Sequence, residues 1–117
     1  MDITSYRYDL FFIRETAKQI IKDFDFFGIE ISFSGNAESA YEELKSQLLP
    51  LISNLLKKDY SKILSVLYRI DVMEKKITKA FLPQYKENRP ALLSDLIIER
   101  ELQKVVVRKI FSERQKE

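Results

Sequence analysis

An unbroken helical stripe of apolar residues occupies the start of this chain. Its members recur at intervals of three and four residues: Ile3, Tyr6, Leu10, Ile13, Ala17, Ile20, Phe24 and Phe27. This spacing keeps one face of an α-helix buried along its whole length. Gly28 follows, the residue type that most easily takes the left-handed conformation after a helix. We therefore predict a central helix from about Ile3 to Phe27, capped by Asp2 or Thr4.

The composition favours one helical domain spanning residues 1–117. A chain of this length with 45% hydrophobic residues can bury a core of its own. Only two glycines are present, so hairpins and glycine-rich loops have few places to form. No signal-peptide pattern opens the sequence, and no uncharged run approaches the roughly 20 residues of a membrane span. We expect a cytoplasmic protein without membrane contact.

The segment after the first helix predicts a connector and a second helix. Residues 29–33 alternate apolar and polar like a strand, but the chain offers no convincing partner strand, so we expect an extended connector. A second helix follows over about residues 37–56, with Ser39 or Asn36 as its cap. Pro50 lies inside this helix and lacks an amide proton, which predicts either a kink or a break there.

The second half of the chain predicts three more helical segments. A stripe from Tyr60 to Ile70 shifts register at Asp71, which indicates a bend followed by a short helix to about Leu82; one helix with a local irregularity is the alternative. The last helix runs from about Pro90 to Glu113. We therefore predict an all-α fold of four main helices in an up-and-down bundle, kinked at Pro50, with an extra short helix after Asp71.

The last predicted helix has two apolar arcs rather than one. Arg100 and Lys104 interrupt the second arc, as at the edge of an interface where long side chains lie over apolar surface. This arc is either core that contacts several neighbouring helices or a surface that binds another protein or a second copy of the chain. The candidate interaction residues are Leu93, Ile97, Arg100, Lys104, Val107 and Phe111.

The charge is unevenly distributed along the chain. Residues 57–89 hold nine Lys and Arg against four Asp and Glu, whereas residues 1–56 hold five against nine. The basic stretch suggests a nucleic-acid surface, on which nearby tyrosines could stack with bases, although a solvated helix face is the simpler interpretation. The candidate basic patch consists of Lys57, Lys58, Lys62, Lys75, Lys76 and Lys79.

The residue types that are missing exclude most chemistry. The chain has no histidine and no cysteine, so the usual general base, thiol nucleophile and transition-metal ligands are absent. Phosphate-binding glycine loops are also absent. We expect no cofactor, no metal and no enzyme activity, with only carboxylate-based chemistry left open. The sequence favours a protein–protein interaction or adaptor domain, whose partner is either another protein or a second copy of the chain bound through the last helix. The alternative is a nucleic-acid-associated helical bundle that uses the basic segment 57–89.

Overall fold

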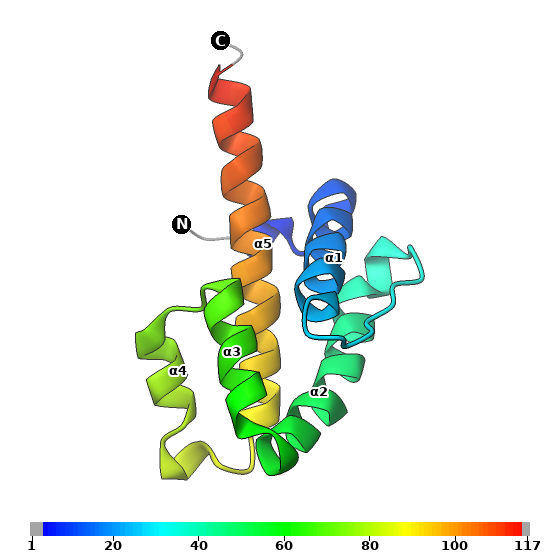
Figure 1. The fold of residues 1–117 in the computed structure, drawn as a ribbon. Helices are drawn as coiled ribbons and strands as arrows, with labels where there is room; N and C mark the ends of the chain where they lie inside the picture. Colours follow the sequence, from blue (N-terminus) through cyan, green and yellow to red (C-terminus); the bar gives the residue numbers. More distant parts are fainter. Residues whose placement is uncertain (1–3, 116–117) are drawn as a thin grey trace.

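The computed structural model describes residues 4–115, which form helices and connecting segments only (Figure 1). The all-α prediction is confirmed. Five α-helices account for most of these residues: α1 (Leu10–Asp25), α2 (Ala40–Lys58), α3 (Tyr60–Ile70), α4 (Glu74–Ala80) and α5 (Arg89–Gln115). Three short 3-10 helices complete the described part: η1 (Thr4–Tyr6), η2 (Ala37–Ser39) and η3 (Pro83–Tyr85).

Helix α1 begins later than predicted. The Asp9 carboxylate accepts hydrogen bonds from the backbone amides of Phe11 and Phe12, at 3.0 and 3.2 Å, and so caps the helix at that point. The predicted start near Ile3 is therefore wrong. Leu10, which was expected to be buried, is 51% exposed. Ile3 and the proposed cap Asp2 lie outside the described residues.

The end of α1 follows the prediction closely. Gly28 adopts a left-handed conformation with φ of 73°. Its amide donates to the carbonyl of Asp25, and the amide of Ile29 donates to the carbonyl of Phe24 at 3.0 Å. This pair of bonds satisfies carbonyls that the helix end would otherwise leave without partners.

The segment between α1 and α2 is an extended connector, as predicted. Ile31 is buried. No strand pairs with this connector in the described part of the chain, and the side chain of Gln47 bonds its backbone instead. The Ser32 amide donates to Gln47 Oε1 at 3.0 Å, and Gln47 Nε2 donates to the Ser32 carbonyl at 2.8 Å. The connector is thereby held along the first turns of α2.

The first two helices do not run antiparallel, as they would in an up-and-down bundle. Ile13, near the start of α1, packs against Ala37 and Ala40, at the start of α2. The connector thus brings the chain back before α2 begins, and α1 and α2 run in the same general direction (Figure 1). The predicted up-and-down arrangement is not confirmed, because the connector is long enough to return the chain.

Helix α2 continues through Pro50 without interruption. The predicted break is therefore wrong, and the kink stays a prediction. Leu48 and Ile52, two residues on either side of Pro50, are both fully buried in the same core, which holds the two halves of the helix together. Asn36 caps the preceding η2 by accepting from the Glu38 amide at 3.0 Å. Ser39 makes no capping hydrogen bond.

The bend after α3 is confirmed. Asp71 takes a left-handed conformation with φ of 66° and ends α3. The proposed capping role of Asp71 for the next helix is wrong, since Met73 precedes α4 and provides no side-chain cap. The Asp71 carboxylate instead accepts a hydrogen bond from Arg100 Nη2 at 3.0 Å.

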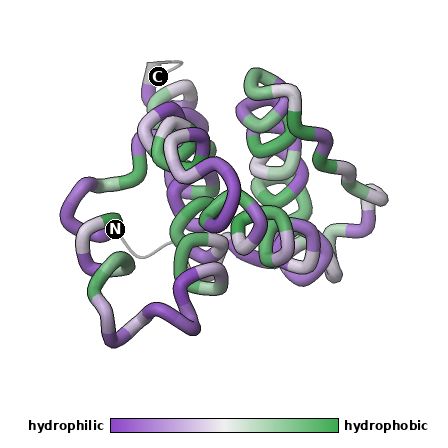
Figure 2. Tube along the Cα trace, turned by 60° about the horizontal axis from the view of Figure 1, so that its bottom comes forward, coloured by the Kyte–Doolittle hydropathy of each residue, from purple (hydrophilic) through white to green (hydrophobic). Residues whose placement is uncertain are grey.

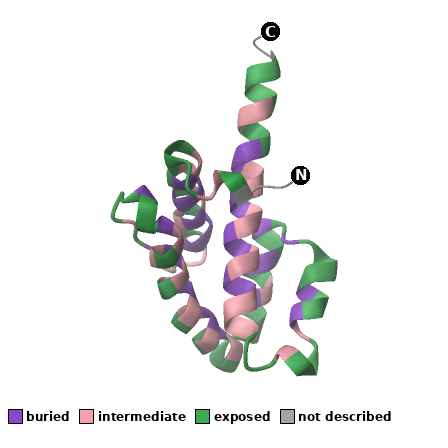
Figure 3. Cartoon of the chain, turned by 180° about the vertical axis from the view of Figure 1, so that it is seen from behind, coloured by how far each residue is buried: buried purple, intermediate pink, exposed green. Residues whose placement is uncertain are grey.

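Helix α5 is the central helix, rather than α1. It packs against all four of the other α-helices, and its residues Leu93, Ile97 and Ile98 are fully buried. Hydrophobic residues gather where the helices face one another (Figure 2). The last turns of α5 extend beyond the other helices and are largely exposed (Figure 3).

Candidate interaction surface

The second apolar arc of α5 divides into a core half and an exposed half. Leu93 and Ile97 are fully buried and belong to the main core. Val107 is 38% exposed and Phe111 is 60% exposed, and both lie near the projecting end of the helix. Only Val107 and Phe111, of the apolar residues in the predicted set, are therefore accessible to a partner.

The two cations of the predicted set have different roles. Arg100 Nε donates to the Asp71 carbonyl at 2.8 Å, so Arg100 fastens α5 to the bend between α3 and α4. Lys104 forms an ion pair with Glu101, whose carboxylate is fully buried. Lys104 also lines a hollow together with Val107, and its side chain thus lies between the core and the surface.

A groove of about 310 Å³ lies between α1 and α5. Its walls are formed by Phe11, Glu15, Lys18, Gln19, Lys22, Val105, Arg108 and Lys109. It adjoins the hollow lined by Gln19, Lys104, Val107 and Arg108. We call these two linked depressions the α1–α5 groove.

The α1–α5 groove is strongly basic. Five Lys and Arg side chains line it, against one carboxylate from Glu15. Glu15 pairs with Lys18 at 3.0 Å. Lys22 and Arg108 have no carboxylate partner among the described residues, and Arg108 instead donates to Gln19 Oε1 at 3.3 Å. These two cations can accept an anionic group from outside the chain.

The groove also has apolar walls. Phe11 is 48% exposed, and Lys109 Nζ lies 5.0 Å from the centre of its ring. Val107 lies in the adjoining hollow, and Phe111 follows one helical turn later on the same face of α5. Basic and apolar side chains therefore share one surface, which suits an amphipathic partner.

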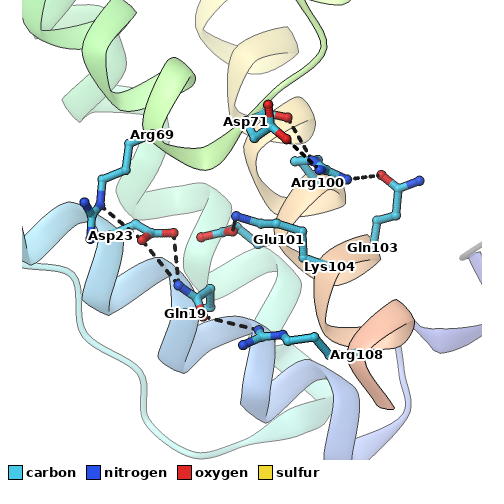
Figure 4. A network of polar contacts seen from close by, with 9 residues as sticks. All are labelled: Gln19, Asp23, Arg69, Asp71, Arg100, Glu101, Gln103, Lys104 and Arg108. Carbon is cyan, nitrogen blue, oxygen red and sulfur yellow. Dashed lines mark hydrogen bonds and ion pairs between the residues drawn. The ribbon is translucent and has the colours of Figure 1, made fainter. Parts of the chain in front are cut away.

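Two buried carboxyl groups contact Gln19 and Lys104, which line this groove (Figure 4). Glu101 of α5 is fully buried and Asp23 of α1 is 4% exposed. Asp23 accepts hydrogen bonds from Gln19 Nε2, at 3.2 and 3.3 Å, and from Arg69 Nε at 3.2 Å. Neither Glu101 oxygen accepts a hydrogen bond of good geometry from the described residues.

The two carboxyl groups have opposite pKa shifts. Burial, together with the neighbouring Asp23, raises the pKa of Glu101 to about 8, although Lys104 acts against this. Burial alone would raise the pKa of Asp23, but hydrogen bonds to Glu101 and Gln19, with the charges of Lys104 and Arg69, lower it. Glu101 therefore keeps its proton to a higher pH than an exposed carboxyl group does, and the Lys104 cation faces it when it ionises.

The opposite pKa shifts of Asp23 and Glu101 resemble those of a catalytic acid–base pair. A substrate in the groove could not reach either carboxyl group, however. Neither Asp23 nor Glu101 lines the groove, and Gln19 and Lys104 lie between them and the groove. A general acid or base must reach its substrate within hydrogen-bonding distance. The pair therefore fits a role in holding α1 against α5.

The predicted basic patch is divided between two places in the fold. Lys57, Lys58 and Lys62 lie around the joint between α2 and α3, whereas Lys75, Lys76 and Lys79 lie on α4. Lys76 and Lys79 line a pocket of about 490 Å³ between α4 and α5, together with Asp95 and Glu99. The two carboxylates in this pocket oppose the binding of a phosphate backbone.

The α1–α5 groove was missed in the sequence because its cations come from opposite ends of the chain. Lys18 and Lys22 lie in the first 56 residues, which are acidic overall, and Lys104 and Arg108 lie in a nearly neutral segment. The sequence did contain a signal, because Lys18 and Lys22, and likewise Lys104 and Arg108, are spaced one helical turn apart. Summing charge over long segments conceals such pairs.

Comparison with protein-family models, curated proteins and solved structures finds no match to this chain. Within the described residues, no group of three or more His, Cys, Asp or Glu is arranged to hold a metal ion. No helix in that same part of the chain is both long enough and apolar enough to cross a membrane.

Proposed function

We propose that this chain is a protein-interaction domain, and that it binds its partner over the α1–α5 groove and the projecting end of α5. One observation carries this proposal: Val107 and Phe111 are exposed beside a groove that already contains Phe11. Apolar side chains next to a depression provide the central contact of many protein interfaces, with a polar rim around them.

The basic patch gives weaker support to the nucleic-acid alternative. Its six lysines lie in two separate places, and the pocket that two of them line also contains Asp95 and Glu99. Binding to a phosphate backbone draws its affinity from many simultaneous cation contacts. The α1–α5 groove is therefore the better candidate.

The proposal can be tested with peptides selected on the chain from an unbiased displayed library. Binding of the selected peptides is then measured by fluorescence anisotropy on a double variant, Val107→Ser with Phe111→Ser. We expect a loss of affinity of about tenfold or more, because exposed aromatic anchors commonly contribute above 1 kcal/mol. A library that yields no binder, or binders that ignore the substitutions, would refute the proposal.

The chain offers a matched control. Tyr68 and Met73 are 62% and 59% exposed and lie on and just after α3, away from the groove. The double variant Tyr68→Ser with Met73→Ser removes a similar exposed apolar surface. Binding should stay at the wild-type level in this control, so that a loss specific to Val107 and Phe111 identifies the interaction surface.

A further inference from the structure

We propose that the α1–α5 groove selects an acidic, amphipathic polypeptide segment, whose carboxylates lie against Lys22 and Arg108 and whose apolar side chains contact Phe11 and Val107. This inference rests on the proposed function and names the chemistry of its partner. It follows from three features of the groove: its charge, its length and its mixture of side chains.

The charge of the groove favours an anionic partner. Lys22 and Arg108 lack carboxylate partners among residues 4–115, while the other three cations of the groove each lie near Glu15, Glu101 or Glu113. Adding two carboxylates would complete the pairing. Charge complementarity of this kind mainly determines which partner is accepted and how fast it associates.

The length of the groove suits a short segment. Phe11 and Lys22 mark its two ends on α1, and eleven residues of helix span roughly 17 Å. A helical segment of about 12 residues covers this distance. The cation pairs Lys18/Lys22 and Lys104/Arg108 each lie one helical turn apart, which matches carboxylates on successive turns of such a segment.

A second copy of this chain is a poor occupant. In a symmetric dimer the same surface meets itself, so the five cations of each groove would gather at one interface with only the Glu15 carboxylate of each chain in the groove lining. Like charges at an interface are unfavourable. The structure thus favours a different protein over self-association through the end of α5.

Nucleic acid is also a poor occupant. Binding to a phosphate backbone draws its affinity from many simultaneous cation contacts, and only two cations of the groove are without carboxylate partners among the described residues. The apolar wall at Val107 would gain nothing from a sugar–phosphate backbone.

The test compares two designed peptides of about 12 residues that carry Leu at the same positions one turn apart. One peptide has Glu at the remaining positions and the other has Lys. We expect the chain to bind the Glu peptide at least tenfold more tightly. In the variant Lys22→Glu with Arg108→Glu, this preference should be lost or reversed, and thermal unfolding followed by circular dichroism verifies that the variant folds.

The control is the variant Lys75→Glu with Lys86→Glu, which changes the net charge equally on exposed residues outside the groove. It should keep the preference for the Glu peptide. Equal binding of both peptides, or an unchanged preference in Lys22→Glu with Arg108→Glu, would overturn the inference. The inference would also be overturned if the chain bound single-stranded DNA more tightly than the Glu peptide. A dimer, detected by light scattering, that dissociates in the variant Phe111→Ser would overturn it as well.

The two proposals fail in different ways. If library-selected peptides lose affinity for the Val107→Ser, Phe111→Ser variant but are neutral or basic, the interaction surface stands and the acidic partner is wrong. If they bind that variant normally, the proposed function itself is wrong.

Discussion

The stability of this chain should decrease as the pH rises from 6 to 9, because Glu101 must ionise inside the core. Burial raises the pKa of Glu101 from 4.5 to about 8. The folded state therefore holds this proton more tightly than the unfolded state. The stabilisation is complete below pH 4.5 and is lost as the pH rises through 8.

The size of the effect follows from this shift. Between the two pKa values the free energy of unfolding falls by about 1.4 kcal/mol per pH unit, and the fall levels off above pH 8. From pH 6 to pH 9 the loss is roughly 3 kcal/mol. The pKa of Asp23 is shifted in the opposite direction, below its ordinary value of 3.8. The stabilisation that Asp23 provides is therefore lost only below pH 3.8, and it does not change between pH 6 and pH 9.

The composition makes the measurement unusually clear. The chain contains no histidine and no cysteine, so the only other group that ordinarily titrates between pH 6 and 9 is the α-amino terminus. Urea unfolding followed by circular dichroism gives the free energy at each pH. The variant Glu101→Gln keeps a neutral side chain that can donate to Asp23, and its stability should be nearly constant over this range.

Glu113→Gln on the same helix provides the control, since Glu113 is exposed. It should keep the wild-type dependence on pH. The reasoning would be refuted if wild type and Glu101→Gln lost stability in parallel, or if the wild type were more stable at pH 9 than at pH 6.

Two further predictions concern the backbone. Pro50→Ala should raise the free energy of unfolding by about 1 to 3 kcal/mol, because it restores an amide proton and removes the ring from a helix interior; a destabilised variant in urea unfolding would contradict this. Asp71→Val should lower stability by about 2 kcal/mol, since a β-branched residue is strained at a φ of 66°, whereas Asp71→Gly should stay within about 1 kcal/mol of the wild type. Equal melting temperatures of the two Asp71 variants would argue against backbone strain there.

Local signals in the sequence predicted several boundaries correctly. Gly28 ended α1, and the register shift at Asp71 ended α3, because each depends on residues adjacent in the chain. The start of α1 could not be decided in this way. Asp2, Thr4 and Asp9 are all able to cap a helix, and the apolar spacing continues through Leu10 although Leu10 is exposed.

The proposed interaction surface could be recognised only once the fold was known. Periodicity identified two arcs on the last helix, but only the packing of α1 to α4 around α5 decides that Ile97 is core and Phe111 is exposed. Glu101 did leave a signal in the sequence. The residues four before and four after it on the helix are Ile97 and Val105, which places a carboxyl group among apolar side chains.

The buried carboxyl pair and the α1–α5 groove are parts of one arrangement. Gln19 donates to Asp23 and accepts from Arg108, and Lys104 reaches from the groove to Glu101 (Figure 4). A change at Lys104 would remove the cation that faces Glu101 and would mix a loss of stability with a loss of binding. Lys22 takes no part in this network, and Arg108 joins it only through a hydrogen bond of 3.3 Å to Gln19. Changes at Lys22 and Arg108 therefore disturb the buried carboxyl pair less than a change at Lys104 would.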